Sequence, residues 1–118
     1  MNFEGLVKSI TEIFSEEPDK PFKNDNVSTV FRHSNNNKWF ALLMKIPKNK
    51  LGEYSDKIVD IVNVKCDPIM IGSLLEEKGI YPAYHMNKEH WITICLDGSV
   101  DDEKILSLID ISYDLTVK

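Results

Sequence analysis

Histidine, tyrosine, tryptophan, asparagine and lysine side chains gather in residues 79–94. This stretch holds two of the three histidines, two of the four tyrosines and one of the two tryptophans. Lysine pairs with phosphate, asparagine can hydrogen-bond an adenine edge, and aromatic rings stack on bases. These residue types suit a nucleic-acid surface. Its candidate contact residues, with two basic residues from nearby strands added, are Tyr84, His85, Asn87, Lys88, His90, Trp91, Lys65 and Arg32.

A zinc site is the first alternative, because His85 and His90 could combine with Cys66 or Cys95 as donors. The two histidines are five positions apart, a spacing that matches neither one face of a helix nor a CxxC framework. Both cysteines lie on apolar runs. We therefore expect no metal site, and histidines that are hydrogen-bonded within a loop.

A thiol enzyme is the second alternative, with Cys66 as nucleophile and His85 or His90 as base. Activation would require an exposed thiolate, yet Cys66 is in phase with Val62 and Val64 on the apolar side of a predicted strand. GxSxG, Walker and GxGxxG motifs are absent from the sequence. We expect no enzymatic activity and no cofactor.

A purely structural role is the third alternative. Tyr81, Pro82 and Trp91 could pack the end of a sheet, while His85 and Asn87 satisfy backbone groups of an irregular loop. The residue pattern leaves this choice open for each side chain.

The first half of the chain predicts a helix and two strands. Apolar residues recur at helical spacing from Phe3 to Phe14, and Pro18 follows. Strand patterns are present in residues 27–33 and 38–46. An asparagine turn at 35–37 joins them, which predicts a hairpin. In the second strand Phe40 is in phase with Leu42, so we expect these two side chains on one face of the sheet.

The second half predicts one more strand pair and two helices. Residues 58–66 form a strand whose polar face carries Asn63 and Lys65. Asp67 and Pro68 begin a helix that Gly79 ends, with Ile69 among its buried residues. A loop is expected over 80–89, then a strand over 91–96 and a final helix with Ile105, Leu108, Ile109, Tyr113 and Leu115 toward the core.

This order of elements predicts an α+β fold in one domain over residues 1–118. The net charge of −5 counts against non-specific coating of nucleic acid, although a local basic face remains possible. The chain begins without the pattern of a signal peptide, and no apolar stretch reaches the ~18 residues of a membrane span. We expect a monomeric cytosolic protein with reduced thiols and no membrane association.

Several motifs resemble the MmcQ/YjbR family of small bacterial proteins. They are Lys65-Cys66-Asp67-Pro68, the run from Gly79 to Lys88 that includes Tyr84-His85-Met86-Asn87, then His90-Trp91-Ile92-Thr93, and finally Ser112-Tyr113-Asp114-Leu115. The resemblance extends from about Val27 to Leu115. It implies a fold similar to CyaY, the bacterial frataxin, in which helices pack on one face of an antiparallel sheet.

The resemblance also implies DNA binding through two projecting wings, with the turn at Asn35-Asn37 as one candidate wing. It places the contacts at Lys65, Tyr84, His85, Asn87, Lys88, His90 and Trp91. The function we expect is that of a DNA-binding accessory or regulatory protein that contacts double-stranded DNA. The alternative is a non-enzymatic module that binds another protein or a small molecule through the same patch.

Overall fold

The computed structural model describes residues 1–118 as three α-helices, one short 3₁₀-helix and five strands. In chain order these are α1 (Phe3–Phe14), β1 (Thr29–Arg32), β2 (Trp39–Pro47), η1 (Lys48–Leu51), β3 (Ile58–Lys65), α2 (Pro68–Leu74), β4 (Ile80–Pro82), β5 (Trp91–Cys95) and α3 (Asp102–Thr116).

The five strands form one antiparallel sheet in the order β1-β2-β3-β5-β4. This arrangement confirms the predicted α+β class. The prediction of a loop over 80–89 was wrong at its start, because β4 pairs with β5 there. Three residues that end in proline are too few to show the alternation of a strand.

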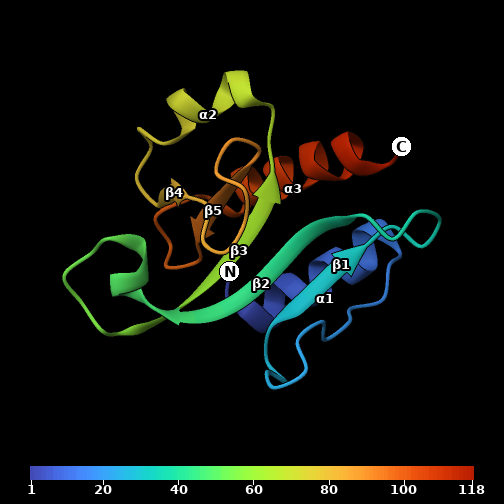
Figure 1. The fold of residues 1–118 in the computed structure, drawn as a ribbon, viewed down its shortest axis with the longest axis horizontal. Helices are drawn as coiled ribbons and strands as arrows, with labels where there is room; N and C mark the ends of the chain where they lie inside the picture. The colour runs from blue at the N-terminus through green and yellow to red at the C-terminus, as the bar shows by residue number, and fades with distance from the viewer.

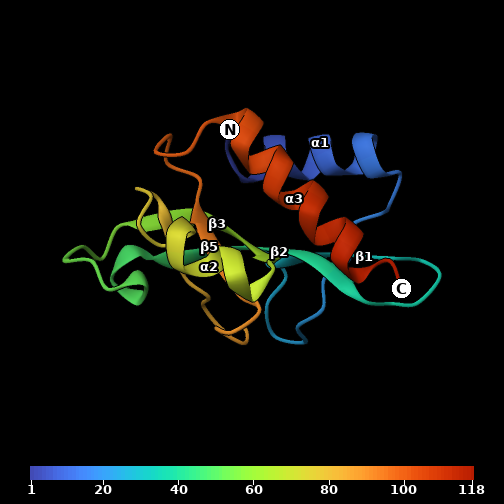
Figure 2. The same ribbon diagram turned by 90° about the horizontal axis from the view of Figure 1, so that it is seen from above.

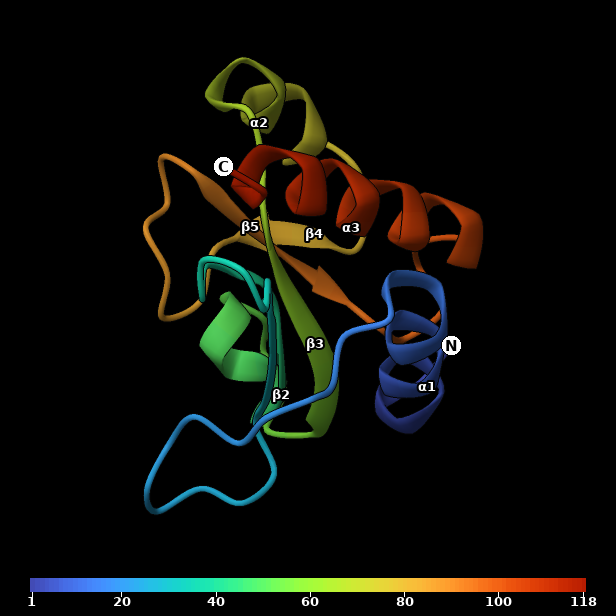
Figure 3. The same cartoon turned by 90° about the vertical axis from the view of Figure 1, so that its right-hand side faces the viewer.

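Helices α1 and α3 cover one face of the sheet, as Figure 2 shows from above. α2 lies at one end of the sheet (Figures 1 and 3). The main core lies between the sheet and the two covering helices, and its fully buried residues include Leu6, Ile10, Phe31, Phe40, Val62, Ile92 and Ile109. No helix combines the length and the apolar character that crossing a lipid bilayer demands.

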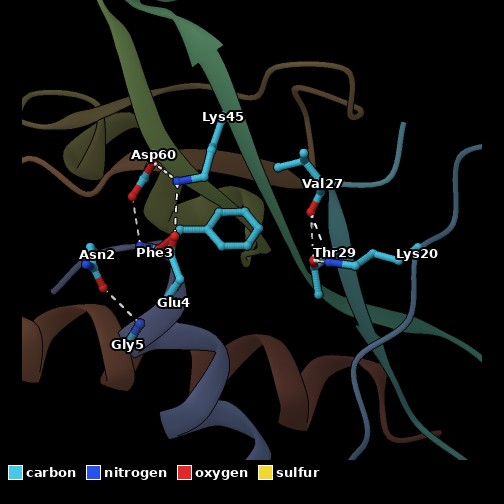
Figure 4. Close-up of polar contacts among 9 residues, drawn as sticks. All are labelled: Asn2, Phe3, Glu4, Gly5, Lys20, Val27, Thr29, Lys45 and Asp60. Carbon is cyan, nitrogen blue, oxygen red and sulfur yellow. Dashed lines mark hydrogen bonds and ion pairs between the residues drawn. The ribbon is translucent and has the colours of Figure 1, made fainter. Parts of the chain in front are cut away.

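Asp60 of β3 fastens the start of α1 to the sheet (Figure 4). Its Oδ2 accepts a hydrogen bond from the Phe3 N–H at 2.8 Å, while its Oδ1 accepts from the Lys45 Nζ at 2.9 Å. Asn2 caps the helix through the Gly5 N–H. One carboxylate therefore satisfies both a free helix N–H and a cation of β2.

A β-bulge in β2 corrects the predicted facing of its side chains. Phe31 pairs with Ala41 and Arg32 pairs with Trp39, so Phe40 is the extra residue. Phe40 consequently packs in the helix-side core with Ala41 and Leu43, whereas Trp39 packs with the cluster on the opposite face. Strict period-2 alternation predicted the reverse for both aromatic residues.

The face of the sheet opposite the helices, here called the open face, carries a second buried cluster. It consists of Val30, Leu42, Met44, Ile46, Val59, Ile61 and Cys95. Asn63 shares this face and is fully buried, which corrects its expected exposure. Its Oδ1 accepts a hydrogen bond from the Thr93 hydroxyl at 2.5 Å, so the amide is buried with a partner.

Two loops, residues 17–28 and 83–90, project from the open face, as Figures 2 and 3 show. In the first, the Lys20 Nζ donates to the Thr29 hydroxyl at 2.6 Å and to the Val27 carbonyl at 3.2 Å (Figure 4). In the second, the Tyr84 N–H donates to the Thr93 hydroxyl at 2.8 Å. Both loops are therefore tied back to the sheet.

The edges of the helices differ from prediction at three apolar residues. Ile69 is 89% exposed, because α2 turns Leu74 and, in part, Ile71 toward the core and leaves Ile69 on its outer side. Ile13 and Leu115, at the ends of α1 and α3, are also exposed, although Ile105, Leu108 and Ile109 are buried as expected. Terminal turns extend past the sheet, so apolar spacing there does not ensure burial.

Candidate nucleic-acid interface

Lys65 and Trp91 face each other across the β3–β5 pair. Lys65 is in phase with Ile61 and Asn63, and Trp91 is in phase with Thr93 and Cys95, so both side chains lie on the open face. Both are half-buried. Directly opposed residues have Cβ atoms only about 5 Å apart, so the side chains of Lys65 and Trp91 leave the sheet from neighbouring positions.

Asn87 organises the loop that follows this pair. Its carbonyl accepts hydrogen bonds from the backbone N–H groups of His90 and Trp91, and its side-chain Oδ1 accepts from the Glu89 N–H at 2.8 Å. The structural role expected as an alternative is therefore present at this residue. The Asn87 Nδ2 makes no hydrogen bond within the protein and the residue is exposed, so its two donors stay free for a ligand.

Tyr84 and His85 form an aromatic pair at the start of the same loop. Their ring centroids are 4.3 Å apart. His85 has a φ of 63°, in the left-handed region that histidine tolerates better than most side chains. Tyr84 packs against the open-face cluster, whereas His85 and His90 are exposed.

The basic residues of the predicted site differ in their partners. Lys65 and Lys88 form no ion pair, while Arg32 is paired with Asp19. Arg32 also lies on β1, two strands away from Lys65, which corresponds to about 10 Å at the usual strand spacing. The structure therefore gathers Lys65, Trp91 and the 83–90 loop, and leaves Arg32 at the far edge.

The Asn35-Asn37 turn belongs to a different part of the molecule. The Asn36 Nδ2 donates to the Thr116 carbonyl at 3.0 Å, and the Lys38 Nζ contacts the carbonyl of Lys118. The turn thus lies beside the C-terminus and away from the 83–90 loop (Figures 1 and 2). The segment that projects from the open face together with the 83–90 loop is the loop at 17–28.

Both cysteines are buried, and the pKa of each thiol is raised. Burial, and the nearby Asp67 carboxylate, raise the pKa of the Cys66 thiol, and burial with Asp97 raises that of Cys95 to about 11. A raised pKa reduces the thiolate that a nucleophile needs. No three or more His, Cys, Asp or Glu side chains are grouped to hold a metal ion.

Sequence reasoning missed three apolar side chains on the open face: Phe22, Trp39 and Met86. They line a pocket between the two loops. Strict alternation placed Trp39 on the wrong face because the bulge at Phe40 cannot be read from the sequence. Phe22 lies in a loop, where no periodicity indicates the direction of a side chain. The two prolines within residues 17–21 were the only signal that this segment is a loop between the first helix and the sheet.

Known proteins match almost the whole chain. The family model described as YjbR matches residues 14–115. The YyaQ protein of Bacillus subtilis is 36% identical over 113 residues, covering 96% of each chain. A crystal structure of a protein from Pseudomonas syringae has a TM-score of 0.96 at 46% identity, covering 98% of this chain and 99% of that one. A Deinococcus radiodurans protein has a TM-score of 0.76 at 25% identity, covering 100% of this chain and 80% of that one.

Proposed function

Because the chain belongs to the YjbR family, we propose that it is a DNA-binding accessory protein that carries out no chemistry of its own. The observation that supports this proposal most directly is the pairing of Lys65 with Trp91, beside a loop that presents Lys88 and the free amide of Asn87. Unpaired cations next to aromatic and amide groups are the means by which proteins contact a nucleic-acid backbone and its bases.

Each residue has a distinct role in the proposed contact. Lys65 and Lys88 pair with phosphates, since no acidic side chain neutralises either of them. The Asn87 amide and the His85 imidazole donate or accept hydrogen bonds. Trp91 and Tyr84 provide ring surface against sugar and base, and His90 lies beside Trp91 at the end of the loop.

Electrostatics limits the strength of this contact. The net charge of −5 repels the phosphates of DNA and lowers the affinity. Glu89 adds a negative charge within the loop itself. Two neutralised phosphates would give a salt slope of about −1.8, which is roughly a tenfold loss of affinity between about 50 and 200 mM salt. The proposed complex is therefore weak, and a single copy of the chain suffices to make it.

A titration of labelled mixed-sequence duplex, followed by fluorescence anisotropy at these two salt concentrations, tests the proposal. The Lys65→Ala, Lys88→Ala double variant should lose most of the salt dependence. Lys8→Ala is the matched control, because Lys8 is an exposed, unpaired lysine on α1. Absence of binding at low salt, or equal effects of the two sets of substitutions, would refute the proposal.

The alternative is an interaction module without a role on DNA. The pocket on the open face favours it, because five of its seven lining residues are hydrophobic. Binding that does not depend on salt would support this alternative.

A further inference from the structure

We propose that the pocket between the two loops of the open face binds a small aromatic molecule that carries one positive charge. The cavity has a volume of about 480 Å³. Sites for small organic ligands range over roughly 300–1,000 Å³, so this cavity has room for a ligand of one or two fused rings.

Strand β2 forms the floor of the pocket with Trp39, Leu42 and Met44. Phe22 and Asp25 of the first loop line one wall, and His85 and Met86 of the second loop line the other. The lining thus combines a mainly apolar surface with two polar groups, the arrangement by which small-molecule sites hold and orient a ligand.

The apolar part of the lining favours a flat ring. Phe22 and Trp39 meet edge to face, with ring centroids 6.2 Å apart. Phe22 is 38% exposed, so a large aromatic surface stays open to solvent at the mouth of the pocket. The side chains of Met44 and Met86 are flexible and polarisable, which lets them adapt to a ring between them.

The charge of the lining favours a cation. Asp25 is its only acidic residue, and it contains no lysine or arginine. The Ser28 hydroxyl donates to the Asp25 Oδ2 at 2.5 Å, and the N–H groups of Val27 and Ser28 donate to Oδ1. The hydrogen bonds from Ser28 and Val27 lower the pKa of Asp25, so it is ionised at neutral pH. The charge of Lys20, in the same loop, also lowers the pKa of Asp25, but the Lys20 Nζ bonds to Val27 and Thr29 and forms no ion pair with the carboxylate. Asp25 therefore gives the pocket a negative charge that Lys20 offsets only from a distance.

The pocket exists before any ligand binds. Hydrogen bonds from Lys20 hold the first loop closed, and the Asp25 N–H donates to the Phe22 carbonyl at 3.2 Å across its tip. The bond from Tyr84 to Thr93 holds the second loop. A preformed site requires little ordering on binding. Only His85 is shared with the proposed DNA contact, so the two sites can be tested separately.

Three indole derivatives of similar size and different charge provide the probes. Tryptamine is a cation, tryptophol is neutral, and indole-3-acetate is an anion at neutral pH. Each is titrated into the ¹⁵N-labelled protein while NMR follows the indole N–H of Trp39 and the backbone of residues 85 and 86. We expect saturable shifts with tryptamine, about tenfold weaker binding of tryptophol, and the weakest binding for indole-3-acetate.

Asp25→Asn tests the origin of this preference. The variant should bind tryptamine and tryptophol to within about a factor of three, whereas Asp56→Asn, at an exposed aspartate without a partner, should leave the tenfold preference intact. Phe22→Ala removes one wall without touching the core, and it should weaken tryptamine binding at least about fivefold.

The proposal is overturned if tryptophol or indole-3-acetate binds as tightly as tryptamine, or if no probe causes saturable shifts at Trp39. Unchanged binding of tryptamine to Phe22→Ala would also overturn it. Should Asp25→Asn fail to fold, the series of three probes on the unmodified protein and the Phe22→Ala variant still decide the question.

Discussion

The side-chain oxygen of Ser112 lies 2.8 Å from the backbone nitrogen of Lys65. The same hydroxyl donates to the Phe40 carbonyl at 2.6 Å, so one serine of α3 bridges β2 and β3 where their ladder ends. The β2–β3 ladder stops at Ala41 and Val64, and Ser112 satisfies the Phe40 carbonyl and the Lys65 N–H just beyond its end.

Ser112→Ala should therefore destabilise the fold by about 1–3 kcal/mol, because two buried backbone groups lose their partner. Urea unfolding measures this change. Ser107→Ala is the control, since Ser107 is an exposed serine of the same helix. Equal stabilities of the two variants would show that the bridge contributes nothing.

Asn87 offers a way to separate loop structure from ligand binding. Asn87→Asp keeps the oxygen that accepts from the Glu89 N–H but removes the free NH₂ and adds a negative charge. We expect it to fold with nearly unchanged stability and to bind DNA more weakly. Asn87→Ala also loses the loop hydrogen bond and should cost about 1 kcal/mol of stability. DNA affinity unchanged in Asn87→Asp would remove this residue from the proposed contact.

Thiol labelling tests the burial of both cysteines. Because the pKa of Cys95 is raised to about 11 and that of Cys66 is raised as well, little thiolate is present at mildly alkaline pH. An aromatic disulfide reagent should react slowly with the native protein and rapidly with both thiols in urea. Fast reaction of one thiol under native conditions would mean that its strand opens or that the thiol is accessible.

Tyr81 should titrate late in the folded protein. Burial, together with the hydrogen bond to Glu53 at 2.8 Å, raises its pKa from 10.0 to about 12. Unfolded chains lose this proton near pH 10 while the native state keeps it, so its contribution to stability is complete below pH 10 and is lost as the pH rises toward 12.

Ultraviolet absorbance of the phenolate, recorded during an alkaline titration, measures this delay. Tyr81→Phe should remove the late component. Glu53→Gln should lower the pKa of Tyr81 only in part, because burial is the larger cause. The absence of a component near pH 12 that disappears in Tyr81→Phe would contradict the burial of this phenol.

Period-2 and helical spacing identified most elements of the fold. Apolar residues at helical spacing predicted α1 and α3, and alternation predicted β1, β2, β3 and β5 to within about two residues. The asparagine turn correctly indicated the hairpin. β4 was missed because a strand of three residues carries no period, and its pairing with β5 is a long-range choice that propensity does not encode.

The candidate site was less predictable than the fold. Adjacent position in the sequence placed the residues of the 83–90 loop together, and strand phase placed Lys65 on the polar face of its strand. The pairing of Lys65 with Trp91 follows from the β3–β5 register, which the sequence did not predict. Sequence patterns could not predict that Asp19 pairs with Arg32, or that Asn63 is buried on a face that two loops cover. These contacts depend on how loops fold back over a sheet, and loops have no repeating pattern to read.

The short edge strands of the sheet bear on how the protein behaves at high concentration. β4 has three residues and ends at Pro82, which has no N–H to offer to another strand. On the opposite edge β1 has four residues, and Asp19 already pairs with Val30 there. Neither border offers a long row of free backbone groups, so copies of the chain have little opportunity to join their sheets into a continuous ribbon.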